Sequence, residues 1–217
     1  ETIKLPPGFS IELWARVSNA RQMALGANDE KGGVLYVGSR GAGTVHAVRF
    51  DGAYRAGKVI RIANSLEMPS GLAWRNGALY VGAVNRILRY DDIDRHLESP
   101  PLPVTVTDSL PRDTHHGWKF MAFGPDGKLY AGTDDGNILR MALDGNNQQV
   151  FANTGGRPLG LRFDAAGNLI VADAYKGLLS IDAKGAISVL TATDGSKPLN
   201  FADDLDIASD GKIYFSE

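Results

Sequence analysis

Short apolar runs recur along the chain, separated by turns rich in Gly, Asn and Asp, and they predict β-strands. The runs read VLYVGSR (34–40), ALYVGAV (78–84), KLYAGTD (128–134), NLIVADA (168–174) and KIYFSE (212–217). Equivalent positions within them recur every 40 to 50 residues. A repeat of this length built from short strands is typical of a β-propeller. We therefore predict an all-β propeller, formed as a single domain by residues 1–217.

Strand counting predicts how the propeller ends. Complete four-stranded units are expected at 20–64, 69–108, 117–153 and 158–193, whereas 201–217 supplies two strands. The stretch FSIELWARV (9–17) alternates apolar and polar residues, so it is predicted to close this last blade from the other end of the chain. The prediction is a five-bladed ring, and the alternative is a fragment of a six-bladed propeller. One helical turn is expected within 90–103.

Composition narrows the classes of partner. The chain has 43% hydrophobic residues and a net charge of −2, so neither nucleic acid nor an anionic membrane surface is an expected partner. It contains no cysteine, which excludes disulfides and thiolate chemistry. No apolar run approaches the roughly 20 residues that span a bilayer. We expect a monomer that binds a small molecule.

Polar residues gather in the loops that a propeller places around one mouth of its central channel. A small-molecule pocket is predicted there because many hydrogen-bonding and ionisable groups would converge. These loops carry Arg21, Gln22, Arg40, Ser70, Asn85, Arg86, His115, His116, Trp118, Lys119, Asp134, Asp135, Asn137, Arg157, Asp173, Tyr175, Lys176, Asp203 and Asp204.

Three runs in residues 1 to about 130 carry a family resemblance. LPPGFSIELWA, ALYVGAVNRILRYDDI and HHGWKFMAFGPDGKLY resemble the PQQ-dependent soluble sugar dehydrogenases of the sorbosone-dehydrogenase type. The resemblance implies oxidation of an aldose or related sugar, with His116 as the general base, since imidazole accepts protons near neutral pH. Where that family has an Arg-Asn pair, this chain has Arg157 and Pro158. The other candidate pocket residues are His115, Trp118, Lys119, Arg40, Arg86, Arg157 and Lys176.

The remaining residues, from about 131 to 217, resemble a second family. GNILRM, TGGRPLGLRFDAAGNLIVADAYKGLL and FADDLDIASDGKIYFSE are similar to the strictosidine-synthase-like propellers, related to the gluconolactonase and paraoxonase group. This resemblance implies a calcium ion that polarises a lactone carbonyl, with Asp173, Asp203 and Asp204 as candidate ligands. Amide oxygens of Asn85, Asn137 and Asn200 would complete the oxygen-rich shell that calcium prefers.

Three functions therefore stay open at the level of sequence. The first is a PQQ-dependent dehydrogenase, the second a calcium-dependent lactonase, and the third a propeller scaffold without catalysis. Two resemblances in one chain suggest recombination or shortening of homologous propellers, by evolution or by design. Family resemblance favours an exported protein, periplasmic or secreted.

Overall fold

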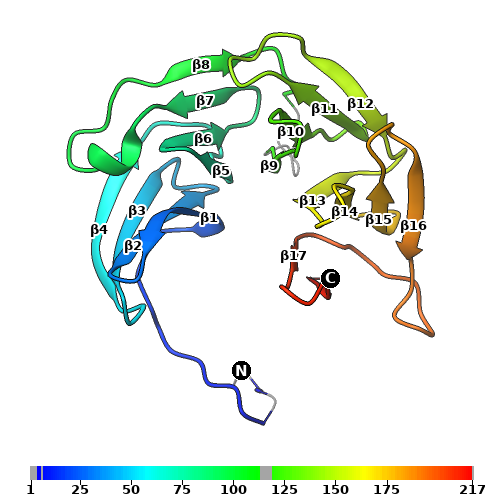
Figure 1. Ribbon diagram of the computed structural model, residues 1–217, viewed down its shortest axis with the longest axis horizontal. Coiled ribbons are helices and arrows are strands. Elements are labelled where there is room, and N and C mark those ends of the chain that lie inside the picture. The colour runs from blue at the N-terminus through cyan, green and yellow to red at the C-terminus, as the bar shows by residue number, and fades with distance from the viewer. Residues whose placement is uncertain (1–3, 6, 113–118, 217) are drawn as a thin grey trace.

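The structure is a computed structural model that describes residues 4–5, 7–112 and 119–216. Its strands form antiparallel sheets that radiate like blades around a central space (Figure 1). The all-β propeller prediction is confirmed. In the described residues, four sheets have four strands each and a fifth has two.

Sequence order runs outward through each of the four-stranded blades. The first blade contains β1 (Ala20–Asp29), β2 (Gly32–Ser39), β3 (Val45–Asp51) and β4 (Ala56–Ala63). The second contains β5 (Gly71–Arg75), β6 (Ala78–Gly82), β7 (Ile87–Tyr90) and β8 (Val104–Thr107). The third contains β9 (Met121–Phe123), β10 (Leu129–Gly132), β11 (Asn137–Met141) and β12 (Gln149–Asn153). The fourth contains β13 (Pro158–Phe163), β14 (Leu169–Asp173), β15 (Gly177–Ile181) and β16 (Ile187–Thr191).

The fifth sheet holds β17 (Leu205–Ile207) and β18 (Ile213–Phe215). First strands of successive sheets are neighbours, in the order β1, β5, β9, β13 and β17. These five strands therefore line the central channel, as the sequence predicts.

Turn chemistry explains why the hairpins form where they do. Between β5 and β6, Asn76 and Gly77 both have positive φ values, of 50° and 83°, which a two-residue type I′ turn requires. Between β9 and β10, the Asp126 carboxylate accepts the backbone N–H of Lys128 at 3.1 Å. Both turns were predicted from sequence, and they pair each inner strand with the second strand of its blade.

The hydrophobic core lies between neighbouring blades. The residue in the middle of each repeated apolar run belongs to this core in the four-stranded blades. Tyr36, Tyr80, Tyr130 and Ile170 are buried, because each faces the next sheet. The fifth equivalent, Tyr214, is 63% exposed. The burial pattern therefore stops at the fifth sheet, where β18 has no further neighbour among the described residues.

A short helical turn links the first two blades. Residues 90–103 contain the 3₁₀ turn η1 (Ile93–Arg95), which confirms the expected helical turn. Asp94 accepts hydrogen bonds from the Tyr36 hydroxyl at 2.7 Å and from the Trp74 indole at 2.9 Å. Because Tyr36 belongs to the first blade and Trp74 to the second, this carboxylate joins the two sheets.

The predicted closing strand at 9–17 is wrong. These residues form no strand and leave the first blade as an extended segment (Figure 1). The Trp14 indole donates to the carbonyl of Tyr54 at 2.5 Å and packs against the Phe50 ring. These contacts hold the segment on the first blade, and it does not pair with β17 or β18. A sixth blade stays a prediction.

Candidate functional site at the channel mouth

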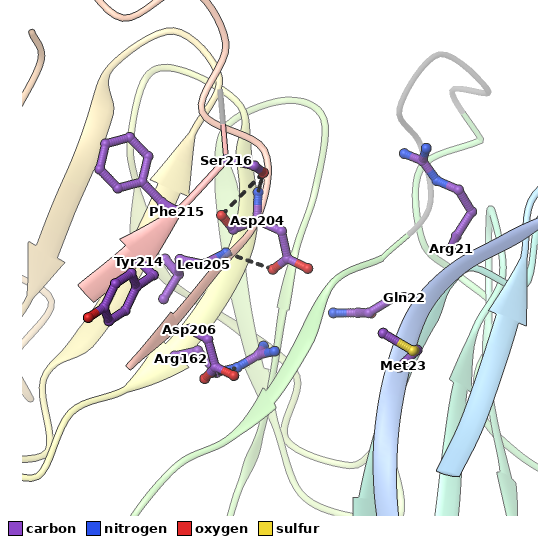
Figure 2. A pocket seen from close by; sticks show the side chains of 10 residues that line it. All are labelled: Arg21, Gln22, Met23, Arg162, Asp204, Leu205, Asp206, Tyr214, Phe215 and Ser216. Atoms are coloured by element: carbon purple, nitrogen blue, oxygen red, sulfur yellow. Dashed lines mark hydrogen bonds and ion pairs between the residues drawn. The ribbon is translucent and has the colours of Figure 1, made fainter. Parts of the chain in front are cut away.

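The inner strands enclose a series of adjoining cavities along the channel. A cavity of about 470 Å³ is lined by side chains from all five inner strands. A second, of about 500 Å³, opens sideways between β1 and the β17–β18 sheet (Figure 2). A third, of about 220 Å³, lies at the channel mouth. The lateral cavity shares lining residues with the other two, so the three cavities adjoin one another.

The residues at the start of the inner strands, or directly before it, line the mouth. This is because each inner strand begins at the same end of the channel. The mouth cavity is lined by Ala20, Arg21, Gln22, Ser70, Phe120, Asp203 and Asp204. Sequence reasoning expected Arg21, Gln22, Ser70, Asp203 and Asp204 among the mouth loops, and the structure places them there. The sequence analysis did not predict Phe120 as a lining residue. Its position directly before β9, the inner strand of the third blade, could have indicated it.

Two buried contacts fix the walls of the mouth. Gln22 accepts the backbone N–H of Leu72 at 2.9 Å, which ties β1 to β5. Gly71 leaves room for the backbone of Lys119, because a Cβ at position 71 would overlap the Lys119 carbonyl oxygen. The second and third blades therefore approach closely at the point where Phe120 enters the cavity.

The far side of the mouth is acidic. Asp203 forms an ion pair of 4.0 Å with Arg21 across the opening. Burial raises the pKa of Asp204; the charge of Arg162 and the hydrogen bond from the Leu205 N–H, at 2.9 Å, oppose that rise. Figure 2 shows Asp204 on the β17 side facing Gln22 on β1. The mouth therefore combines carboxylates on one wall with amide and guanidinium groups on the other.

Three carboxylates near this end of the channel each keep a buried oxygen without a hydrogen-bond partner among the described residues. They are Oδ1 of Asp134, Oδ2 of Asp173 and Oδ1 of Asp203. The other oxygen of Asp173 accepts three backbone N–H groups, from Arg157 at 3.0 Å, Tyr175 at 3.0 Å and Lys176 at 3.1 Å. A buried carboxylate oxygen without a partner is unfavourable, so a cation at any of the three positions would stabilise it.

The predicted metal ligands are only partly brought together. Asp203 and Asp204 line the same cavity, whereas Asp173, the last residue of β14, does not line it. In the described part of the chain, no group of three or more His, Asp or Glu side chains is arranged to hold a metal ion. A calcium site here would need backbone or amide oxygens besides Asp203 and Asp204, and it stays a prediction.

The predicted quinone pocket stays a prediction, because part of it lies outside the described residues. His115, His116 and Trp118 lie outside the described residues. Lys119 and Arg157 are buried, whereas Arg40, Arg86 and Lys176 are exposed. None of these five basic residues lines the mouth, lateral or central cavity.

A family model described as "Strictosidine synthase-like, N-terminal" matches residues 112–141. Protein STRICTOSIDINE SYNTHASE-LIKE 3 of Arabidopsis thaliana is 36% identical over 126 residues, which cover 46% of this chain and 32% of that protein. The chain is similar to strictosidine synthase-like proteins. The adipocyte plasma membrane-associated protein of Danio rerio is 37% identical over 107 residues, covering 41% of this chain and 25% of that protein. The chain thus spans about a third or less of the length of these relatives.

The family match bears on the predicted boundary between two resemblances. Residues 112–141 include the run HHGWKFMAFGPDGKLY, which sequence reasoning assigned to the sugar-dehydrogenase type. The strictosidine-synthase likeness therefore begins before residue 130. Recombination of two families stays a prediction.

Solved structures share the fold with this chain. The PQQ-bound aldose sugar dehydrogenase of Streptomyces coelicolor has a TM-score of 0.65 and 20% identity, covering 93% of this chain and 75% of that one. A putative gluconolactonase has a TM-score of 0.57 and 16% identity, covering 81% and 68%. A chain of the nidogen–laminin complex has a TM-score of 0.69 and 18% identity, covering 94% and 74%. Such different proteins on one fold leave function to the site itself.

None of the helices among the described residues has the length and apolar character needed to cross a bilayer.

Proposed function

We propose that the chain forms the channel of a strictosidine-synthase-like propeller that binds calcium at its mouth and hydrolyses a small lactone or related ester. The observation that carries this proposal is the buried Oδ1 of Asp203, which lacks a hydrogen-bond partner among the described residues and belongs to the mouth cavity. Asp204 lies beside it. Two adjacent carboxylates of which one has an unsatisfied buried oxygen favour a hard cation, since calcium prefers oxygen ligands.

The described residues suggest a division of roles in the mouth. Asp203 and Asp204 would hold the calcium, which when bound would polarise a lactone carbonyl. Gln22 uses its Oε1 to accept the Leu72 N–H, which leaves its amide nitrogen to donate to a substrate oxygen. Figure 2 shows this nitrogen directed across the opening, toward the β17 side. Phe120 provides an apolar wall for the carbon skeleton of the substrate.

Relatives support the choice of class. The family model and the curated relatives point to strictosidine synthase-like proteins, whereas the dehydrogenase is matched at the level of fold. The export expected from sequence is kept in this proposal, and the name of the Danio rerio relative, a plasma membrane-associated protein, agrees with it.

The described residues support PQQ less than calcium. The quinone carries several carboxylates, and among the described residues that line the mouth Arg21 faces two carboxylates, Asp203 and Asp204. The dehydrogenase with His116 as base stays a prediction from sequence. An absorbance titration with PQQ tests it, and saturable binding that His116→Ala abolishes would favour the dehydrogenase over the lactonase.

Calorimetric titration with calcium tests the proposed site. We expect Asp203→Asn to weaken binding by about tenfold or more, because it removes a ligand charge. Asp210→Asn is the matched control, because Asp210 is an exposed turn residue whose Oδ1 accepts the Lys212 N–H at 3.1 Å, a role that an asparagine oxygen also fills. Equal calcium affinity in the parent chain and both variants would contradict the proposal.

Catalysis is measured separately with a panel of lactones and a pH indicator. We expect acid release that calcium restores after chelation and that Asp203→Asn lowers. If calcium binds but no lactone is opened, the metal site stands and the hydrolase assignment is wrong.

A further inference from the structure

The central cavity holds one basic side chain in an otherwise apolar wall. Among the described residues that line this cavity of about 470 Å³, Arg162 and Asp206 carry charges and all the others are apolar. Arg162 belongs to the inner strand β13, and Asp206 belongs to the inner strand β17. A guanidinium group in such surroundings attracts an anion strongly, because apolar walls lower the local dielectric constant.

The ion pair between these two residues is loose. Arg162 Nε lies 3.5 Å from Asp206 Oδ1, whereas a charge-assisted hydrogen bond measures roughly 2.7–2.9 Å. The Asp206 side chain is 80% exposed and that of Arg162 is 32% exposed. Arg162 Nη1 donates to the Leu161 carbonyl at 2.9 Å, while Nη2 makes no hydrogen bond within the described part of the chain. A ligand carboxylate is therefore able to replace Asp206, because such an exposed pair contributes little to stability.

Another arginine of the same fold shows a guanidinium whose donors are all used. Arg89 Nε and Nη2 donate to the two carboxylate oxygens of Asp91 at 2.6 and 3.1 Å, and Nη1 donates to the Leu143 carbonyl at 3.0 Å. Arg89 thus holds together parts of the second and third blades. The guanidinium of Arg162, in contrast, keeps N–H donors for a ligand.

A backbone contact fixes the position of Arg162 relative to the mouth. The Gly160 N–H donates to the Asp203 carbonyl at 2.8 Å, and a Cβ at position 160 would lie 2.8 Å from Asp204 Cα. Arg162 follows two residues after Gly160, and two residues of a strand span about 7 Å. Figure 2 shows its guanidinium beside Asp206, on the same wall of the lateral cavity as Asp204. A compact ligand is therefore able to reach Arg162 and the mouth carboxylates at the same time.

Electrostatics also link Arg162 to the mouth. Burial raises the pKa of Asp204, and the positive charge of Arg162 opposes that rise. The guanidinium therefore acts on one of the two carboxylates that would hold calcium.

We propose that Arg162 binds a carboxylate of the substrate, so that the preferred lactone carries a carboxylate on its ring. This inference rests on the proposed lactonase, which places the lactone carbonyl at Asp203 and Asp204. A planar guanidinium matches a carboxylate with two parallel hydrogen bonds, and the two charges balance. A phosphate carries close to two negative charges, more than the single cation among the described lining residues offsets.

Binding without turnover tests this site. Calorimetric titration with calcium present compares an oxocyclopentane carboxylate, a ring ketone that is not hydrolysed, with its neutral primary amide. We expect the carboxylate to bind about tenfold or more tightly than the amide. Arg162→Gln should remove this preference. Asp206→Asn should increase it, because the substitution removes the carboxylate that competes for Arg162 and keeps an oxygen for the Ile207 N–H.

The opposite effects of these two variants separate ligand binding from a structural role. Loss of a structural ion pair would change both variants in the same direction. Arg55→Gln is the matched control, because it removes the same charge from an exposed Arg–Asp pair in the β3–β4 hairpin and should leave the preference unchanged.

Several results would overturn the proposal. One is equal affinity of the parent chain for the carboxylate and the amide. A second is a preference that survives Arg162→Gln, since the carboxylate would then bind elsewhere, for example on the calcium. If Arg162→Gln does not fold, Asp206→Asn decides, and an unchanged or weaker preference in that variant rejects the site.

The lactonase is tested apart from this site. If the ketone carboxylate binds as expected but no lactone is opened, the Arg162 site stands and the hydrolase is wrong. If lactones are opened with no preference for a ring carboxylate, the hydrolase stands and the role of Arg162 is wrong.

Discussion

Aspartates serve two different purposes in this propeller. In the turns, as at Asp144 and Asp182, a carboxylate oxygen accepts backbone N–H groups two to four residues ahead. At the mouth, Asp203 instead keeps one buried oxygen without a partner in the described chain. Sequence alone does not separate the two kinds, because both occur in short polar loops. The difference depends on which carboxylates the inner strands bring to the channel.

Asp173 combines both roles: one of its oxygens accepts backbone N–H groups, and the other is buried without a partner among the described residues. Its contribution to stability is testable. Asp173→Ala would remove the acceptor of the buried Arg157 N–H and of the part-buried Tyr175 N–H, whereas the Lys176 N–H would keep the Asp173 carbonyl at 3.3 Å. An unsatisfied buried N–H costs about 1–3 kcal/mol, so we expect a loss of about this size in the free energy of unfolding, mainly from Arg157. Asp173→Asn keeps an acceptor oxygen and should recover most of it. Urea unfolding of both variants measures the difference, and equal stability of the two would refute this role.

At the scale of the strand, the sequence predicts what depends on local pattern. The inner strands, the Asn76-Gly77 turn and the helical turn near Ile93 follow from periodicity and turn residues, and all are present. The alternation at 9–17 also predicts a strand, but pairing is set by a long-range contact, that of Trp14 with Phe50 and Tyr54. A pattern shows that a segment is able to pair and does not show which edge it meets.

The same limit applies to the site. Placement of Asp203, Asp204 and Gln22 follows from strand order, because every inner strand starts at the same end of the channel. Burial of Lys119 does not follow from its polar side chain. It depends on the close approach of two blades at Gly71, which a pattern of apolar and polar residues does not encode.

That approach predicts a severe effect of one methyl group. In Gly71→Ala the new Cβ would overlap the Lys119 carbonyl oxygen and push β5 and β9 apart. We expect a loss of about 3 kcal/mol, or failure to fold, because backbone cannot move aside as a side chain can. Gly57→Ala is the control, since its Cβ would lie 3.4 Å from the nearest atom. Thermal unfolding compares them, and a Gly71→Ala midpoint equal to that of the control would show that the blades adjust.

At the scale of the whole molecule, the lateral cavity between β1 and the β17–β18 sheet brings charged and apolar side chains together. Arg21 and Asp203 face each other across the lateral opening, and Arg162 pairs with Asp206 at 3.5 Å on the β17 side. Met23 and Tyr214, on opposite sides of the same cavity, are exposed. The Arg21–Asp203 pair thus bridges the opening, while Met23 and Tyr214 are exposed on either side of it.

Acid should weaken the whole propeller through its turns. Backbone N–H donors lower the pKa of Asp51, Asp144, Asp182 and Asp194 below the ordinary value of 3.8. A depressed folded-state pKa contributes stability that is present above the unfolded value and is lost as pH falls through the folded values. Asp204 acts in the opposite sense, because burial raises its pKa and its protonation relieves that cost as pH falls.

The pKa values of Asp135, Asp164 and Asp210 are lowered too, so these carboxylates outweigh Asp204 and predict a net loss of stability as pH falls below about 4. A variant with Asn at positions 51, 144, 182 and 194 keeps an acceptor oxygen in each turn but does not titrate there. We expect its unfolding midpoint in urea to fall less steeply than that of the parent chain between neutral pH and pH values below 3.8. The measurement is a series of urea titrations across this range. Parallel curves for the two proteins would mean that the acid sensitivity of the ring arises outside these turns.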